Sequence, residues 1–182
     1  MKKLIIFRHG DYELNSSDKQ LTIRAAKDVF ARTKLIAEVM GKADIVLTSP
    51  VLRAAQTAAV IAKAMGNPRI YQEPLLAEKH SQDKELLEES IIDYALDLEC
   101  DTIVAVTHYP NIKQAFGVGL EAGMEIIFEA EQWNNIFDKR PSNLFAKIPV
   151  HKEDTIEQYF APRCYDEDLQ KLKEIDFLQD KI

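Results

Sequence analysis

The chain has 182 residues, of which 46% are hydrophobic and 29% are charged. This composition is typical of a folded globular domain and excludes a disordered or fibrous chain. The formal net charge is -7, whereas proteins whose main partners are nucleic acids or anionic membranes need a surplus of lysine and arginine. We therefore expect a single domain over residues 1–182, with no nucleic-acid or membrane partner and with any basic site confined to a small area.

The N-terminal residues do not predict a secretory signal. Arg8 interrupts the first apolar run after five residues, whereas a signal peptide needs ~7 to 15 apolar residues. The sequence also has no run near the ~18 apolar residues of a membrane span. The cysteines are Cys100 and Cys164, and their spacing fits no CxxC or Cys/His metal motif. We expect a cytoplasmic protein with reduced thiols.

Strands are predicted first, from apolar segments rich in isoleucine and valine. They cover residues 3–7, 44–48 and 101–107, and a shorter strand is predicted over residues 69–72. Continuous apolar runs of this length are typical of strands covered on both faces, as in a parallel sheet.

Helical patterns lie between these strands. Apolar residues recur at helical spacing over residues 22–40, 51–65 and 84–98, and the first two patterns stop at Gly41 and Gly66. Strands that alternate with helices predict an α/β fold with a mostly parallel sheet and helices on both faces. Ligands of such folds bind beyond the carboxyl ends of the strands.

The later elements are predicted less distinctly. A helix is expected from Pro110 to about residue 120, and residues 125–137 are ambiguous, with helical character around EAEQW. Residues 143–150 and 155–160 predict two strands, and residues 166–178 predict a charged helix.

Polar groups suited to phosphate binding follow each of the three long apolar runs. Arg8 and His9 follow the first run, and His108 follows the third. After the second run, Ser49 is predicted to cap a helix whose first turn carries Arg53. Helix N-termini and arginine side chains both match phosphate oxygens. We expect the two arginines and two histidines to share one edge of the sheet and to bind one anion.

These motifs resemble a known family. The strings RHG, TSPVLRAAQTA and VTHYPN, in this order over roughly residues 1–120, are similar to those of the histidine phosphatase superfamily. That superfamily includes cofactor-dependent phosphoglycerate mutases and bacterial phosphohistidine phosphatases. The resemblance implies that His9 is the nucleophile and forms a phosphohistidine intermediate. It further implies that Arg8, Arg53 and His108 hold the phosphoryl oxygens, without a metal or other cofactor.

Other positions match the family pattern more loosely. Asn15 falls where mutase-like members place a phosphate-contacting asparagine, and a polar loop residue is the alternative interpretation. Ala25 stands where the family usually has the glycine of LTxxG. Gln56 and Thr57 are expected to pack their helix beneath the site.

Two carboxylates are candidates for the proton donor to the leaving group. General acid catalysis contributes ~10²- to 10⁴-fold to such reactions. Glu78, followed by His80, resembles the LxE pattern of mutase-like members and is the first candidate. Asp11 is the second candidate, because it follows RHG directly. An ordinary exposed glutamate is the alternative interpretation of Glu78, and His80 is expected at the surface.

The segment between Glu78 and His108 is short, about thirty residues, whereas mutase-like members carry a much longer cap here. A short cap implies an open pocket that admits a phosphorylated small molecule or a phosphoprotein. We therefore expect a phosphatase that hydrolyses a phosphohistidine or phosphomonoester. The alternatives are a phosphoglycerate mutase-like phosphotransferase and an idle domain that binds phosphorylated ligands. Residues 124–141, with Trp133, are assigned no role, and no oligomeric state is predicted.

Overall fold

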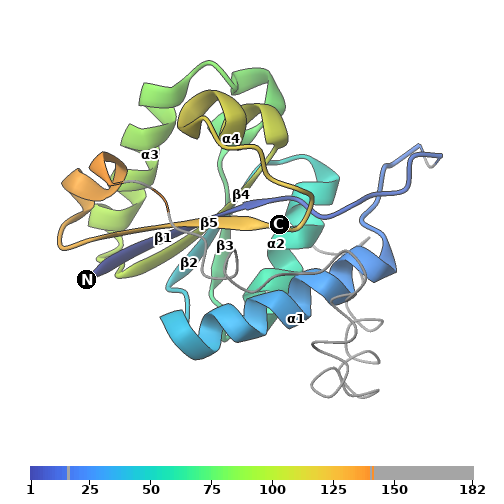
Figure 1. Cartoon of the computed structure of the whole chain (residues 1–182), viewed down its shortest axis with the longest axis horizontal. Coiled ribbons are helices and arrows are strands. Elements are labelled where there is room, and N and C mark those ends of the chain that lie inside the picture. Colours follow the sequence, from blue (N-terminus) through green and yellow to red (C-terminus); the bar gives the residue numbers. More distant parts are fainter. Residues whose placement is uncertain (16, 140, 142–182) are drawn as a thin grey trace.

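The computed structural model describes residues 1–15, 17–139 and 141. Within them the chain alternates between strands and helices (Figure 1). The elements are β1 (Lys2–Arg8), α1 (Ile23–Met40), β2 (Ile45–Thr48), α2 (Leu52–Ala64), β3 (Arg69–Gln72), α3 (Lys84–Asp97), β4 (Thr102–Thr107), α4 (Tyr109–Phe116) and β5 (Glu125–Ala130). Short 3₁₀ turns are η1 (Pro74–Leu76), η2 (Glu78–His80) and η3 (Trp133–Asp138).

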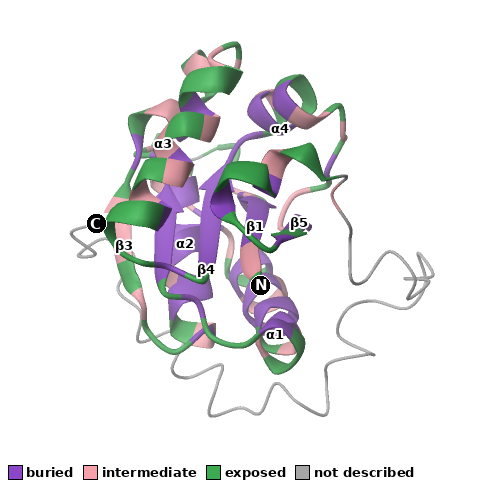
Figure 2. Ribbon diagram, turned by 90° about the vertical axis from the view of Figure 1, so that its left-hand side faces the viewer, coloured by how far each residue is buried: buried purple, intermediate pink, exposed green. Residues whose placement is uncertain are grey.

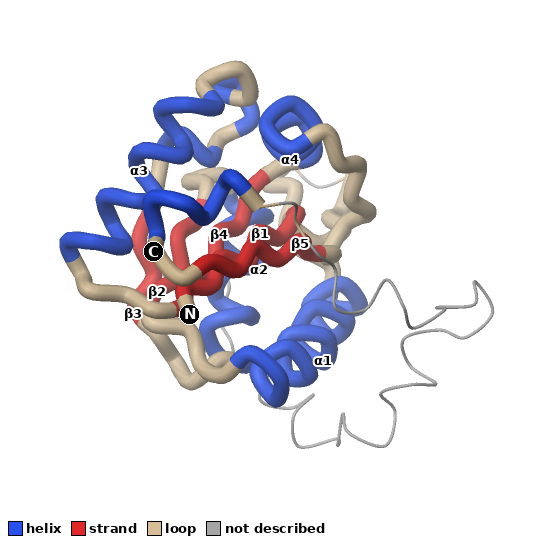
Figure 3. The backbone as a smooth tube through the Cα atoms, turned by 60° about the vertical axis from the view of Figure 1, so that its left-hand side comes forward, coloured by secondary structure: helices blue, strands red, loops and turns tan. Residues whose placement is uncertain are grey.

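The strands form one sheet in the order β3-β2-β4-β1-β5. Neighbouring strands are parallel except β5, which runs antiparallel to β1. Figure 3 shows this sheet between two layers of helices, with α1 and α2 on one face and α3 and α4 on the other. The α/β prediction, a mostly parallel sheet covered on both faces, is confirmed.

Burial follows from this three-layer arrangement. All residues of β2 and β4 are buried, as continuous apolar runs between two layers require (Figure 2). One core cluster joins the sheet to α1 and α2 through residues such as Val29 and Ile61. The other joins it to α3 and α4 through residues such as Ile91 and Ile112.

The helix ends explain where the chain turns. Thr22 caps α1, since its Oγ1 accepts a hydrogen bond from the backbone N of Ala25 over 3.0 Å. Helix α4 stops at Phe116, earlier than predicted, because Gly117 takes a left-handed conformation with φ of 69°. Helix α2 begins at Leu52, with Val51 rather than Ser49 as its N-cap residue. The prediction that Ser49 is the N-cap residue is therefore wrong, although its hydroxyl accepts a hydrogen bond from the backbone N–H of Val51 over 3.3 Å and also contacts His108.

Residues 125–137, which are ambiguous in the sequence, form a strand followed by most of the 3₁₀ turn η3, so helical character around EAEQW is wrong for Glu129 and Ala130. Residues 125–130 form β5, which pairs with β1 and sends Ile127 into one core layer and Ile126 and Phe128 into the other. Pairing and burial on both faces outweigh the local helical character of EAEQW. Trp133 is buried in η3 and donates its indole N–H to the carbonyl oxygen of Cys100 over 2.7 Å, so it has a packing role.

The stretch between β3 and β4 supplies η1, η2 and α3. Residues Leu87, Ile91 and Ala95 of α3 pack into the core, so this helix covers the sheet rather than extending above the strand ends. Among the described helices, none combines the length and the apolar character that crossing a bilayer requires. The strands predicted at 143–150 and 155–160 and the helix at 166–178 lie outside the described residues.

Candidate active site

Strand pairing brings the three predicted motifs to one edge of the sheet. The central strand β4 lies between β1 and β2, parallel to both, with Arg8 opposite Thr107 and Thr48 opposite Val106. The backbone N–H of His9 then donates to the carbonyl of Thr107 over 3.0 Å. The residues that follow these three strands therefore emerge side by side.

His9 is buried, with 4% of its surface exposed, and its ring orientation is fixed. Its Nδ1 lies 2.8 Å from the carbonyl oxygen of Gly10. Since a carbonyl can only accept, Nδ1 carries the proton and Nε2 carries the lone pair. The Nε of Arg53 donates a hydrogen bond to this Nε2 over 3.1 Å.

Both site histidines are neutral near pH 7. Burial lowers the pKa of His9 to about 4, and nearby Arg53 and Arg8 act in the same direction. Burial likewise lowers the pKa of His108 to about 3, with further contributions from His9, Arg53 and Arg8. A neutral imidazole has the free electron pair that a nucleophile needs.

His108 completes this face of the site. Its ring lies against that of His9, with 5.0 Å between centroids. Its Nε2 lies 2.8 Å from Ser49 Oγ, and its Nδ1 lies 3.4 Å from Nη2 of Arg53. Because Nδ1 faces a guanidinium, which can only donate, Nε2 carries the proton and donates it to the Ser49 hydroxyl.

The Arg53 side chain connects the groups of the site. Besides its contacts with the two histidines, its Nη2 lies 3.4 Å from Glu78 Oε2. The guanidinium also stacks over the ring of Tyr12, 4.8 Å from the centroid. Arg53 thus holds a position from which its fork of donors can meet an anion in front of His9.

Arg8 is held on the other side by the chain beyond α4. Its Nη1 donates to the carbonyl of Leu120 over 2.8 Å, and its guanidinium stacks over Tyr109 at 5.3 Å. Its Nε is buried and has no hydrogen-bond partner among the described residues. A buried donor without a partner is energetically unfavourable, so this nitrogen is one that a bound anion could satisfy only if the surrounding side chains move.

Neighbouring residues fix the backbone around His9. Thr57 Oγ1 accepts from the N–H of Gly10 over 3.1 Å, and Gln56 Oε1 accepts from the N–H of Leu21 over 2.7 Å. The expected packing role of Gln56 and Thr57 is confirmed. At Gly10 a Cβ atom would come within 2.7 Å of Leu21 Cδ1 and 3.1 Å of the Ala25 methyl group, so the Leu21 side chain would have to move to accommodate any larger residue.

The less certain candidates are placed differently. The Glu78 carboxylate is half-exposed and joins the site through Arg53. Asp11 and Asn15 are exposed on the loop after β1, and no side-chain contact within the described part of the chain joins Asn15 to the four central residues. His80 pairs with Asp83, 2.7 Å from Nδ1 to Oδ2, at the partly exposed margin.

Several contacts were not predicted from the sequence: the tyrosines that stack on the arginines, the Ser49 hydroxyl and the Leu120 carbonyl. Tyr12 and Tyr109 lie within a few residues of His9 and His108, and this proximity is the signal that could have drawn attention to them. The Leu120 carbonyl has no side-chain signal at all.

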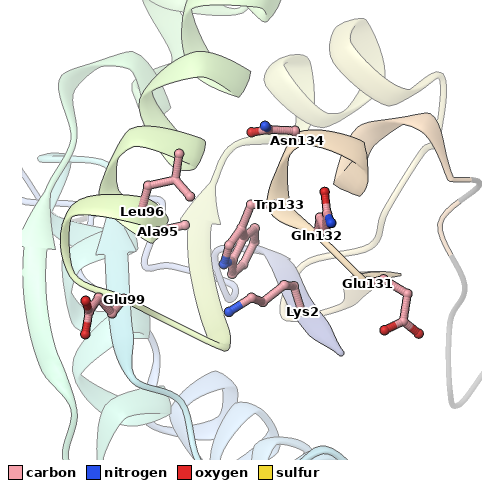
Figure 4. A pocket seen from close by; sticks show the side chains of 8 residues that line it. All are labelled: Lys2, Ala95, Leu96, Glu99, Glu131, Gln132, Trp133 and Asn134. Atoms are coloured by element: carbon pink, nitrogen blue, oxygen red, sulfur yellow. The ribbon is translucent and has the colours of Figure 1, made fainter.

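A separate hollow of about 370 Å³ lies at the opposite end of the sheet, where β1 begins (Figure 4). It contains none of the residues that surround His9. Its lining residues are Lys2, Ala95, Leu96, Glu99, Glu131, Gln132, Trp133 and Asn134.

The fold resembles several solved structures. The protein histidine phosphatase SixA complexed with tungstate is 17% identical, with a TM-score of 0.64 over 71% of this chain and 89% of that chain. A putative phosphohistidine phosphatase SixA from Nakamurella multipartitia is 15% identical, with a TM-score of 0.62 over 78% and 92%. Phosphoserine phosphatase from Entamoeba histolytica, in complex with 3-phosphoglyceric acid, is 17% identical, with a TM-score of 0.55 over 79% and 95%.

At these identities the solved structures establish the fold. No curated protein matches the sequence significantly. The family model of the histidine phosphatase superfamily (branch 1), however, matches residues 4–101, which is more than half of the chain and includes the RHG segment and Arg53. The chain therefore belongs to the histidine phosphatase superfamily.

Proposed function

We propose that the protein is a phosphatase that hydrolyses a phosphohistidine or a phosphomonoester through a covalent intermediate on His9. The observation that carries this proposal is the arrangement of the His9 ring. Its Nδ1 is held by the Gly10 carbonyl, so Nε2 presents its lone pair toward Arg53. The low pKa of about 4 keeps this ring unprotonated at neutral pH.

In the proposed reaction, Nε2 of His9 attacks phosphorus as the bond from phosphorus to the leaving group breaks. The phosphoryl oxygens replace Nε2 as the acceptor for Arg53, which frees the lone pair for attack. Arg8 and Arg53 stabilise the charge on these oxygens, and His108 joins them when a phosphoryl oxygen replaces the Ser49 hydroxyl as the acceptor of its Nε2 proton. Water then attacks phosphorus, releases inorganic phosphate and restores neutral His9.

Glu78 is the proposed proton donor to a leaving oxygen. Its carboxylate lies 3.4 Å from Arg53, at the margin of the phosphate position, and is open to solvent on one side. A donor must carry its proton when the ester binds. The carboxylate of Asp11 is exposed on the first loop, which makes it the second choice.

Hydrolysis is favoured over phosphoryl transfer because little of the chain encloses the site. The segment between Glu78 and His108 consists of η2, α3 and β4, and α3 packs on the sheet. Water can therefore reach a phosphorylated His9, whereas a mutase must exclude it. A phosphoglycerate mutase-like phosphotransferase is the alternative, and it would require a bisphosphorylated activator.

Two arginines supply the positive charge that a metal ion provides in other phosphatases, so we propose a metal-independent reaction. The substrate would be a phosphorylated small molecule or a phosphoprotein. Phosphohistidine and phosphoserine are the first compounds to test, because similar folds occur in proteins named for them.

A substrate panel with phosphoenzyme trapping tests the proposal. Purified protein would be incubated with a phosphohistidine protein, phosphoserine, p-nitrophenyl phosphate and sugar phosphates, with chelator or with vanadate. We expect activity that survives chelator and is lost in vanadate, and an acid-labile, alkali-stable phosphoryl group on His9 that is absent in His9→Ala. Activity that requires added metal, or an unlabelled His9 during turnover, would contradict the proposal.

A further inference from the structure

A cluster of buried hydrogen bonds connects the β4–α4 junction to the backbone just before Glu78. Thr107 Oγ1 donates to the carbonyl of Leu76 over 2.7 Å. Asn111 Nδ2 donates to the carbonyl of Ala77 over 3.0 Å and approaches that of Leu75 at 3.5 Å. Three consecutive carbonyl groups are therefore held by two side chains.

These two side chains lie on either side of His108 in the sequence, and each is only 1% exposed. Ala77, whose carbonyl Asn111 holds, directly precedes Glu78. The junction that presents His108 to the pocket thus also fixes the backbone from which Glu78 extends. The Glu78 side chain is 54% exposed and contacts Arg53, so the anchored backbone sets where the side chain starts and Arg53 sets where its carboxyl group ends.

Packing alone does not explain why an asparagine occupies position 111. Its side-chain oxygen is buried without a hydrogen-bond partner in the described part of the chain, which is unfavourable. A leucine has the same number and branching of side-chain heavy atoms and would fill the space without leaving a buried oxygen unsatisfied. The amide group does what leucine cannot, which is to hold the carbonyls that precede Glu78.

We propose that Thr107 and Asn111 are positioning residues that hold Glu78 at the leaving-group side of the site. This inference rests on the proposed function of Glu78 as proton donor. As the bond from phosphorus to oxygen breaks, its electron pair stays on the leaving oxygen, and the Glu78 carboxyl group transfers its proton there. Glu78 becomes a carboxylate and is reprotonated by taking a proton from the water that attacks the phosphoenzyme.

Leaving-group dependence separates positioning from a general loss of structure. A p-nitrophenolate ion leaves readily without a proton, whereas an alkoxide does not. We expect Thr107→Val and Asn111→Leu to lower kcat/KM for alkyl phosphates roughly tenfold, a part of the ~10²- to 10⁴-fold contribution of a general acid. The same variants should change kcat/KM for p-nitrophenyl phosphate less than about threefold.

Two further substitutions serve as controls. Thr107→Ser keeps the hydroxyl group and should preserve the ratio of alkyl to p-nitrophenyl phosphate activity. Thr33→Val removes a buried hydroxyl that donates to the carbonyl of Val29 over 2.6 Å within α1, away from Glu78. It is a matched loss of one buried hydrogen bond and should leave the same ratio unchanged.

The Glu78→Gln background completes the test. There Asn111→Leu should cause no further change in the ratio, because the donor is already absent. An equal loss on all substrates, or a further change of the ratio in the Glu78→Gln background, would overturn the inference. If wild-type His9 is phosphorylated during turnover but the ratio does not respond to these variants, the inference alone fails. If His9 is never phosphorylated, the proposed function fails first.

Discussion

The Nε of Arg53 donates a hydrogen bond to Nε2 of His9 over 3.1 Å, so a guanidinium points at the atom proposed to attack phosphorus. The same guanidinium contacts Glu78 and His108 through Nη2. One planar fork thereby aligns the nucleophile, the proposed proton donor and the second histidine.

Lysine at position 53 would keep the positive charge but lose the planar set of donors, and this loss should reduce activity. We expect Arg53→Lys to lower kcat/KM ~10²-fold, because lysine cannot donate to several phosphoryl oxygens in one plane. The conservative control is Arg24→Lys in α1, since the Arg24 side chain is 72% exposed and far from the fork in the sequence. Steady-state kinetics on p-nitrophenyl phosphate would measure both. Equal activity of Arg53→Lys and wild type would exclude bidentate binding by Arg53.

The low pKa of His9 predicts the acidic limb of the pH profile. Because burial lowers this pKa to about 4, His9 stays neutral and nucleophilic from pH 8 down to about pH 5. We expect kcat/KM to show no loss from His9 protonation in that range, and to fall only as the pH approaches 4. The measurement is a pH profile with p-nitrophenyl phosphate, corrected for ionisation of the substrate. A limb near pH 6.5 would mean that the His9 pKa is not lowered.

The sequence could predict those site residues that lie at the ends of predicted strands. Arg8, His9 and His108 follow apolar runs, and parallel pairing of β1 and β4 necessarily brings those ends together. Contacts that depend on distant segments have no such local signal. The Leu120 carbonyl that holds Arg8 is 112 positions away in the chain, and the pair of Arg32 with Glu125 spans 93 positions.

Strand β5 was missed for a related physical reason. One face of this strand carries Ile126, Phe128 and Ala130, whereas the other carries Ile127 between Glu125 and Glu129, so it lacks the continuous apolar run of β2 and β4. Its extended state is decided by pairing with β1 rather than by local propensity. The sequence places the start of α2 only to within a residue or two, because Ser49 and Val51 both precede the first helical turn. The Ser49 hydroxyl accepts from the N–H of Val51 and also contacts His108, which is 59 positions away and gives no local signal.

The two histidines also predict how stability depends on pH. Their folded pKa values, about 4 and about 3, lie below the value of 6.5 for an unperturbed histidine. The unfolded chain therefore binds more protons between these values, so the free energy of unfolding decreases as pH falls below 6.5. Above pH 6.5 the histidine contribution is constant.

Urea unfolding at pH 7 and pH 5 would measure this effect. We expect a loss on the order of 1 kcal/mol per histidine in the wild type. The double variant His9→Gln/His108→Gln should lose less over the same interval, because its site has no imidazole to protonate. An identical pH dependence in the two proteins would show that other groups are responsible.

Gly10 is predicted to be essential for the position of His9. In Gly10→Ala the new methyl group would lie 2.7 Å from Leu21 Cδ1 and 3.1 Å from the Ala25 methyl group, so either these side chains or the loop that carries His9 must shift. We expect kcat to fall ~10²-fold, since small misplacement of a nucleophile is costly. Ala25→Gly combined with Gly10→Ala should recover part of the loss by removing one of the two contacts. An unchanged kcat in Gly10→Ala would show that the close approach has no catalytic consequence.

Arg32 and Glu125 form a buried ion pair beneath the site. We expect substitution of either residue to lower the free energy of unfolding strongly. The pair connects α1 to the first residue of β5, which pairs with Phe7 just before Arg8. Both side chains are almost fully buried, and Arg32 Nη2 donates to Glu125 Oε1 over 3.0 Å in addition to the contact from Nε. Removing one partner leaves a charge in a medium of low polarity.

We therefore expect Arg32→Met and Glu125→Gln each to lower the free energy of unfolding by about 3–5 kcal/mol. The double variant Arg32→Met/Glu125→Gln should lose clearly less than the sum of the two, because neither charge is then left without the other. Urea unfolding of the four proteins measures this coupling. The exposed pair of Arg24 and Asp28, 3.9 Å apart, serves as a control whose removal should cost less than about 1 kcal/mol. Additive losses in the buried pair would show that the two side chains are stabilised independently by their surroundings.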